Sequence, residues 1–412
     1  MSGPAAAEDV LAASAHYDPD PSNPIDFWRR EGRWPNQLFT PGEEQSMSLN
    51  QSLHHASGRR QPTALSKMSL DKRWRKEKNS PYRDPRYEFI MRGKGTFMHE
   101  SPLGVADESL QTCRDLLSGA QPCPEGTIFD DAVFETACGN LQGRNELRVI
   151  QDLTRLIVPA AETLALYDQE HRYDVLTETF NEGWHNSFPF LGTHPQPDYS
   201  VGFQRDSFTE EQLLNLSPFI REFLGSDVSY FTATYDMYFP FLACEVYCGA
   251  EGLDVADRQN THATTIAARG VAELFQLLGR EEEVHRKIVA FSVSHDCQGV
   301  RIYGCYPVFD DERKLIEFFR HPIHTFDLTE VDSQGRWAAY RFTKNLYENW
   351  MPEHFKWICS ALDQLPPVDA DEVPALSASD SVSSQGPEKP PTMSHVDTAS
   401  EPLEEGSQAV KA

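Results

Sequence analysis

The stretch FPFLACEVYCGAEGLDVADRQN, residues 239–260, constrains the fold more than any other part of the chain. It begins as an apolar and aromatic run typical of a buried β-strand and carries Glu245 in its middle. It continues through glycines into the expected start of a helix at Asp257. A carboxylate among apolar neighbours is unfavourable unless it is paired or binds a cation. Any fold of this chain must therefore place a partner beside Glu245.

Three other polar groups are expected to point into the same interior. Asp198 begins the expected strand PDYSVGF, and Glu146 lies in line with the apolar stripe of a helix that starts near it. Gln259 lies one turn into the helix that follows the glycines, on its inward stripe. Because side chains alternate along a strand, Glu245 shares its face with Tyr247. The sequence thus brings four polar groups inward from two helices and two strands.

The expected elements alternate between helices and strands and predict an α+β domain, a mixed sheet flanked by helices, at about residues 81–364. Its expected strands are at about 198–203, 229–247, 287–295 and 299–308, and its expected helices at about 144–158, 209–220, 256–278, 340–350 and 352–365. Residues 1–80 and 365–412 are rich in Pro, Ser and charge and are predicted to be disordered arms.

Charge is distributed unevenly along the chain. Residues 101–364 hold 20 Lys and Arg against 41 Asp and Glu, and an acidic body of this kind repels nucleic acid at long range. Residues 59–94 are basic, with 12 Lys and Arg against 4 Asp and Glu. This segment is typical of a nuclear-import signal or a nucleic-acid arm, and equally of a solvated linker.

Compartment and membrane contact can also be predicted. The eight cysteines form no CxxC pair, the N-terminus lacks the pattern of a secretory signal, and no apolar run approaches the ~18 residues of a membrane span. We expect a nuclear or cytoplasmic protein with reduced thiols and no membrane partner.

The order Pro197-Asp198, then Glu245-Val246-Tyr247, then Gln259 resembles the PD-(D/E)XK nuclease superfamily. That pattern is an early helix Glu, a PD at a strand, ExK on the next core strand and a helix that often carries Gln. Residues 81–364 more closely resemble an uncharacterised domain found in many fungal proteins, on the segments YRDPRYEFIM, NELRVIQDL, PQPDYSVGF, FPFLACEVYCGAEGLDVADRQN and RFTKNLYENWMPEHFKWICSALDQL. Members of that family generally read CEVKCG where this chain reads CEVYCG.

The resemblance implies a restriction-endonuclease-like fold and metal-dependent hydrolysis of DNA or RNA. Asp198 and Glu245 would hold Mg²⁺ or Mn²⁺ through oxygen ligands, and Glu146, Tyr247 and Gln259 would complete the catalytic set. Tyr247 stands where the pattern has its lysine. A phenol with a pKa of ~10 is neutral at pH 7, so the activity is expected to be weak or lost.

A replacement charge could come from the following helix. Arg258, His262 and Arg269 form a stripe beside the one that holds Gln259 and are candidate nucleic-acid-binding residues. Arginine is a poor base because it is effectively always protonated.

Each of these residues also has a purely structural interpretation. Asp198 could cap a turn, Glu245 could pair with an arginine, and Gln259 and Glu146 could serve helix starts. A non-catalytic module that binds protein or nucleic acid on the same scaffold is therefore the competing function. Zinc at the HPIH motif, residues 321–324, is less favoured because no close Cys pair completes four ligands.

Overall fold

A computed structural model describes residues 78–223, 226–310 and 315–367. Most of the two expected arms, and residues 59–77 of the basic segment, lie outside these described residues. Residues 78–83 are helical, so helical structure is already present before the expected domain boundary at residue 81.

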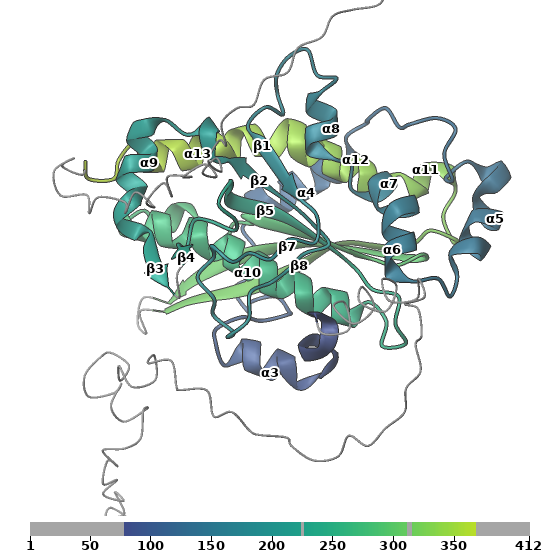
Figure 1. The fold of residues 1–412 in the computed structure, drawn as a ribbon, viewed down its shortest axis with the longest axis horizontal. Coiled ribbons are helices and arrows are strands. Elements are labelled where there is room, and N and C mark those ends of the chain that lie inside the picture. The colour runs from purple at the N-terminus through teal and green to yellow at the C-terminus, as the bar shows by residue number, and fades with distance from the viewer. Residues whose placement is uncertain (1–77, 224–225, 311–314, 368–412) are drawn as a thin grey trace, which may run out of the picture. The chain divides into compact units, whose positions relative to one another are not determined.

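The described strands form a six-stranded mixed sheet in the order β1-β2-β5-β6-β7-β8, which confirms the predicted architecture (Figure 1). All neighbours are antiparallel except β5 and β6, which are parallel and are joined by a long helix. The strands are β1 (Leu176–Thr179), β2 (Tyr199–Gln204), β5 (Met237–Val246), β6 (Ala290–His295), β7 (Gly299–Asp310) and β8 (Leu315–Asp327), with a separate pair of β3 (Arg221–Phe223) and β4 (Ser226–Val228).

Helices cover both faces of the sheet. In Figure 1, α10 (Asp254–Leu277) lies on one side of the strands, with α3 (Arg86–Arg92) beyond it, while α12 (Ala338–Asn345) and α13 (Met351–Leu362) lie on the other side. The remaining described helices are α4 (Asp107–Ser118), α5 (Asp131–Leu141), α6 (Glu146–Val149), α7 (Arg155–Ile157), α8 (Ala161–Ala165), α9 (Glu210–Leu216) and α11 (Ser333–Arg336), with π-helical turns at Ile150–Thr154 and Leu346–Trp350.

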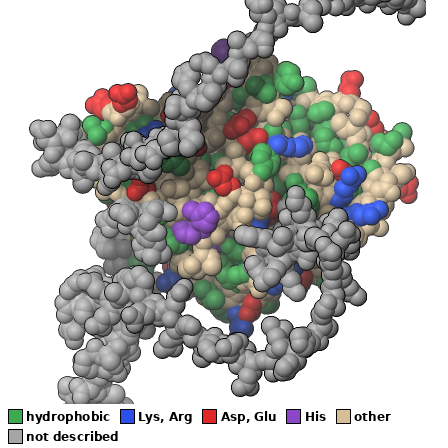
Figure 2. All heavy atoms as spheres, viewed as in Figure 1, with side chains coloured by type: hydrophobic (Ala, Val, Ile, Leu, Met, Phe, Trp, Pro, Cys, Tyr) green, Lys and Arg blue, Asp and Glu red, His purple; other side chains and the backbone are tan. Residues whose placement is uncertain are grey.

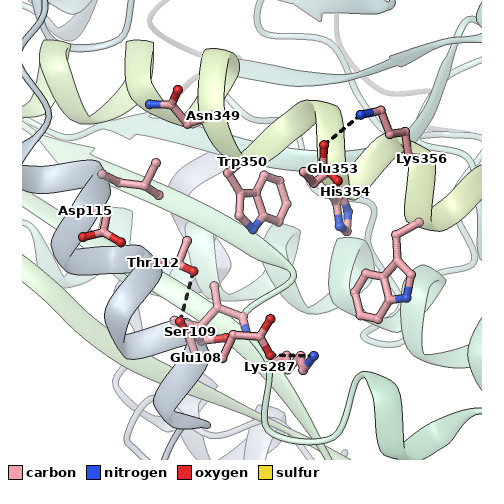
Figure 3. A pocket seen from close by; sticks show the side chains of 13 residues that line it. Glu108, Ser109, Thr112, Asp115, Lys287, Asn349, Trp350, Glu353, His354 and Lys356 are labelled. Carbon is pink, nitrogen blue, oxygen red and sulfur yellow. Dashed lines mark hydrogen bonds and ion pairs between the residues drawn. The ribbon is translucent and has the colours of Figure 1, made fainter.

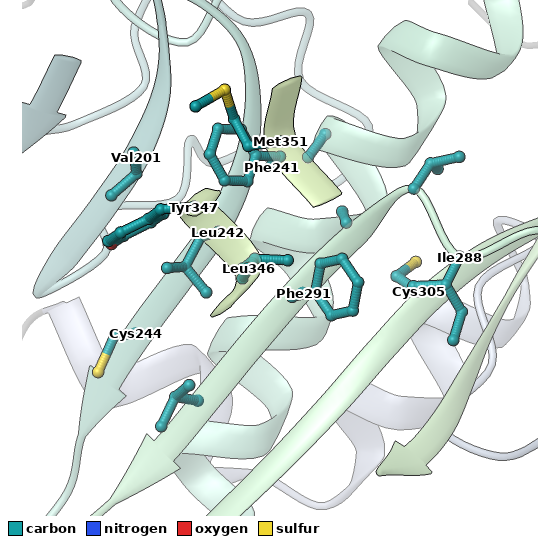
Figure 4. Close-up of a cluster of buried hydrophobic side chains, with 14 of the residues drawn as sticks. Val201, Phe241, Leu242, Cys244, Ile288, Phe291, Cys305, Leu346, Tyr347 and Met351 are labelled. Atoms are coloured by element: carbon teal, nitrogen blue, oxygen red, sulfur yellow. The ribbon is translucent and has the colours of Figure 1, made fainter. Parts of the chain in front are cut away.

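The main apolar core lies between the sheet and α12 and α13. The ring of Phe291 on β6 meets Phe342 and Trp350 edge-on, at centroid distances of 5.8 and 5.0 Å. Figure 4 shows Phe291 near Leu346, with Leu242 of β5 in the same cluster. All ten residues of β5 are buried, as expected for a central strand covered on both faces.

The helix α10 packs unusually close to its surroundings because it carries small residues. Ala263 and Ile266 pack against Ala243 of β5 in a second apolar cluster. At Gly270, an added Cβ would lie 2.5 Å from the backbone oxygen of Tyr230. A buried ion cluster also holds the start of α10, because Asp257 accepts hydrogen bonds from Arg301 and Tyr303 of β7 at 2.7 and 3.1 Å.

Strand β8 is an element that the sequence patterns missed. The HPIH motif lies within it, and Pro322 interrupts the apolar alternation that would have indicated a strand. A proline is tolerated there because β8 is an edge strand of the sheet, where fewer ladder hydrogen bonds are required. The predicted helix at 144–158 is helical over α6, the π turn and α7, with Val149, Leu153 and Ile157 buried.

Gly270→Ala should destabilise the protein by ~1–3 kcal/mol, because the new methyl group meets backbone that cannot move aside without disturbing α10. Gly139→Ala in α5 is the matched control, since no atom lies within 4 Å of its added Cβ. That change should stabilise by up to ~1 kcal/mol through helix propensity. Urea unfolding of both variants would measure the difference, and equal effects would contradict the close packing of α10.

Candidate functional site

Asp198 and Glu245 converge on a single cation, the ammonium group of Lys78. The Nζ atom of Lys78 lies 3.0 Å from Oδ1 of Asp198 and 2.9 Å from Oε2 of Glu245. The three side chains are only 8, 3 and 2% exposed. The partner that the buried Glu245 requires is thus a lysine, and Asp198 lies beside Glu245, as the family resemblance implied.

The end of strand β5 fixes this geometry. Asp198 immediately precedes β2, and its Oδ2 accepts a hydrogen bond of 2.9 Å from the backbone N–H of Val246, the last residue of β5. Pairing of β2 with β5 sets Tyr199 opposite Cys244, so Asp198 follows directly in register beside Glu245. Two neighbouring strands therefore carry their carboxylates to the same edge.

Gln259 and Asn79 extend the cluster. The Nε2 of Gln259 donates to Oδ1 of Asn79 at 3.1 Å and lies 3.4 Å from Oε2 of Glu245. Asn79 in turn donates to Oε1 of Glu146 at 3.5 Å. All four polar groups predicted from the sequence therefore gather here, although the half-buried Glu146 joins through Asn79.

Charge balance at the site is set by burial. Burial raises the pKa of Glu245 to about 8, although the ammonium of Lys78 opposes the rise. Burial also favours the neutral amine of Lys78, but the carboxylates of Asp198 and Glu245 outweigh it and raise the pKa of the lysine. One buried ammonium balances one carboxylate charge, so near pH 7 a protonated Glu245 leaves the cluster close to neutral.

Residues 78–92 are held against α10 by buried contacts beyond Lys78. Arg258 donates through Nε to the backbone oxygen of Tyr82 at 2.6 Å. The hydroxyls of Tyr82 and Tyr87 lie 2.9 and 3.3 Å from Nδ1 of His262. We call residues 78–92 the docking segment.

The docking segment covers the face of α10 that was predicted to bind nucleic acid, so that prediction is wrong. Arg258 is 8% exposed and His262 is fully buried beneath the segment, so neither presents a charge to solvent. Arg269 is half-buried, pairs with Glu273 at 3.2 Å and lies over the ring of Tyr230. The stripe fails as a binding surface because sequence periodicity identified the face without showing that residues 78–92 cover it.

Tyr247 takes no direct part in the carboxylate cluster. It is buried beneath the docking segment, in an apolar cluster with Tyr82, Tyr87 and Val255, and its hydroxyl donates to the exposed Glu251 at 2.5 Å. Burial and this hydrogen bond raise the pKa of Tyr247 to about 12, so the side chain stays neutral at pH 7.

The oxygen atoms at the site suit a hard divalent cation. Asp198 and Glu245 already share one positive charge, and the buried Oε1 of Gln259 has no hydrogen-bond partner among the described residues. Within residues 78–223, 226–310 and 315–367, no group of three or more His, Cys, Asp or Glu side chains is placed to hold a metal ion. The carboxylates of Asp198 and Glu245 are therefore the candidate ligands for a divalent cation at this cluster.

A separate cavity of ≈ 670 Å³ lies between α4 and α13, on the opposite face of the sheet (Figure 3). Its polar groups are largely paired: Lys287 with Glu108 at 2.8 Å, and Lys356 with Glu353 at 2.8 Å. The stacked rings of His354 and Trp350 form part of its wall. Asp115 of the lining accepts a hydrogen bond from Gln111, and the buried Nε2 of His354 has no hydrogen-bond partner among the described residues. Each ion pair of this cavity joins one acid to one lysine, whereas the carboxylate cluster holds two acids on one cation, so the cavity is the weaker candidate.

The outer surface offers no comparable concentration of charge on the face that Figure 2 shows, where acidic and basic side chains are interspersed with apolar ones. No described helix combines the length and apolarity required to cross a membrane. All eight cysteines are free thiols.

Comparison with protein families places the chain in a group defined by sequence. A family model described as a domain of unknown function, DUF7924, matches residues 133–362, more than half of the chain. The chain belongs to this family. The matched range contains Asp198, Glu245 and Gln259, whereas Lys78 and Asn79 lie upstream of it. Among curated proteins, none matches the chain.

Sequence reasoning missed Lys78 and Asn79. They lie in a polar, charged stretch that also fits a linker, and Lys78 is 120 and 167 residues away from its two partners. The weak signal available was that two inward-facing acids, Asp198 and Glu245, required a cation.

Stability should fall in acid because His262 is buried in its neutral form. Burial lowers the pKa of His262 to about 3, against 6.5 for the ordinary side chain. Over this range the unfolded state binds a proton at His262 and the folded state does not, so stability is lost as the pH falls from about 6.5 towards 3.

His262→Gln should abolish this proton uptake by the unfolded state. The free energy of unfolding should then fall less steeply between pH 6 and 4, by about 1.4 kcal/mol per pH unit. Urea unfolding at each pH would measure it, with His171→Gln on the exposed surface as control. A slope shared by His262→Gln and the wild type would contradict a neutral His262.

Proposed function

We propose that the domain is a metal-dependent phosphodiesterase of the PD-(D/E)XK kind that acts on nucleic acid. The observation that carries this proposal is the convergence of Asp198 and Glu245 on one cation, at 3.0 and 2.9 Å, at the ends of two adjacent strands. Gln259 on the following helix lies against the same Glu245 oxygen. Three positions of the sequence pattern thus meet in a buried cluster whose oxygen atoms suit Mg²⁺ or Mn²⁺.

Each residue has a definite task in this proposal. Asp198 and Glu245 bind the ion, and the N–H of Val246 keeps the carboxylate of Asp198 in place. Gln259 orients Glu245, and Asn79 holds Gln259. When bound, the metal ion supplies the positive charge that activates water and stabilises charge developing on a phosphate. The buried surroundings strengthen these electrostatic interactions because little water screens them.

The acidic body sets a condition on the substrate. A body with twice as many Asp and Glu as Lys and Arg repels long nucleic acids, so binding should be weak and should depend on Mg²⁺ or Mn²⁺ at the site. Nucleic acid as the substrate, and action in the nucleus, rest on the sequence resemblance and on the basic segment.

One observation favours the competing function, a non-catalytic interaction module. Lys78 already contacts both carboxylates, and with Glu245 protonated the cluster is close to neutral, so charge balance at this point does not require a metal ion. In that case the cluster is an internal ion pair that fixes the docking segment, and binding to a partner uses other surfaces.

Purified full-length protein should cleave DNA or RNA in Mg²⁺ or Mn²⁺, and EDTA should stop the reaction. Asp198→Asn and Glu245→Gln should each lower the rate by ~10²-fold or more, because each removes a charge that holds the metal ion. Glu251→Gln is the matched control, since this nearby carboxylate is exposed and contacts Tyr247 instead of the cluster.

Gel assays on supercoiled plasmid, single-stranded DNA and structured RNA would measure these rates. If the folded wild-type protein cleaves none of them with either metal, the nuclease proposal is wrong and the interaction module stands.

A further inference from the structure

The cation at the carboxylate pair comes from a part of the chain that the sequence pattern does not include. Tyr247 occupies the lysine position of the pattern, but it is neutral and its hydroxyl points to Glu251. Arg258 is committed to the backbone of Tyr82. Among the described residues, Lys78 is the ammonium that contacts both carboxylates.

The placement of Lys78 is built into the fold. The next residue, Asn79, contacts both Gln259 and Glu146, and the segment continues through Tyr82 and Tyr87 to the buried ring of His262. Asn79 and Tyr82 are 4 and 5% exposed, and Met91 is fully buried. A segment anchored at this many buried points fixes the backbone at Lys78, so its ammonium is delivered to one place.

The ammonium lies where the two carboxylates would hold a divalent ion. Both oxygen contacts of Lys78 are at ordinary hydrogen-bond distance, and the side chain is 8% exposed. A metal ion and this ammonium therefore compete for the same oxygens. Because a lysine side chain is long and flexible, its head can move aside while the anchored backbone stays.

We propose that Lys78 replaces the lysine missing at position 247: its ammonium holds the carboxylate pair when no metal is bound, and it shifts beside the metal ion to supply positive charge to the phosphate. This inference rests on the proposed function. It assigns a catalytic role to the docking segment, which lies upstream of the residues matched by the family model.

The first test uses the wild-type protein and needs no activity. In protein labelled with ¹⁵N-lysine, the buried ammonium of Lys78 should give its own Nζ signal by NMR, assigned by its loss in Lys78→Arg. Saturating Mg²⁺ should shift or broaden this signal and leave the other lysine signals unchanged. If Mg²⁺ bound to the protein and left the Nζ signal of Lys78 unchanged, the ammonium and the metal ion would not share the same oxygen atoms, and the proposal would be wrong.

The second test separates metal binding from the reaction. Lys78→Met should bind Mn²⁺ more tightly than the wild type in calorimetry, because the competing ammonium is gone. At saturating Mn²⁺ its cleavage rate should still fall by ~10²–10³-fold, the usual effect of losing one positioned charge. Lys78→Arg should keep the charge and part of the rate. Lys344→Met, which removes a lysine of α12 paired with Glu348, is the control.

These outcomes distinguish the two proposals. If Lys78→Met cleaved at the wild-type rate at saturating Mn²⁺, the proposed role of Lys78 would be wrong and the nuclease proposal would stand. A wild-type protein that cleaves nothing would end the nuclease proposal and the catalytic role with it. Lys78→Met leaves two buried carboxylates without their cation and can fail to fold. In that case Lys78→Arg and the NMR titration of the wild type decide.

Discussion

Two carboxylates buried at the end of adjacent strands require a cation, and much of the surrounding structure follows from that requirement. Asp198 and Glu245 are almost fully enclosed, and an uncompensated pair of buried charges would oppose folding by several kcal/mol. Lys78 meets this need from a segment far away in the chain. Once its ammonium is in place, the residues after it lie along α10 and bury Tyr82, Tyr87 and Met91.

The docking segment also explains why α10 is buried on nearly all sides. Ala263 and Ile266 face the sheet, while Arg258 and His262 face the segment. A helix enclosed in this way needs small residues where the backbone comes close, as at Gly270, and hydrogen-bonded polar residues where tyrosines meet it. The polar residues of α10 therefore serve the interior of the protein.

Local patterns were sufficient to predict the central elements and part of the site. The apolar run before Glu245 and the small-residue stripe of α10 have strong periodicity, so β5, α10 and the inward direction of Glu245 and Gln259 could be predicted. That Asp198 and Glu245 lie together was implied by the family resemblance. Lys78 could not be predicted, because a contact across 167 residues leaves no periodic signal and its neighbours are polar. Strand β8 was hidden by Pro322, and the burial of His262 depended on a segment whose docking no local pattern indicates.

The position of Lys78 bears on where this domain begins. The family model starts at residue 133, yet the ammonium that balances the buried acids comes from residue 78, and Val105 and Leu116 of the main core also precede the matched range. A recombinant fragment trimmed to residues 133–362 would keep both acids and lose their counter-charge. Such a fragment would have to take up protons or cations from solution beside the two acids. The unit defined by sequence similarity is therefore smaller than the unit in which the buried charges are balanced.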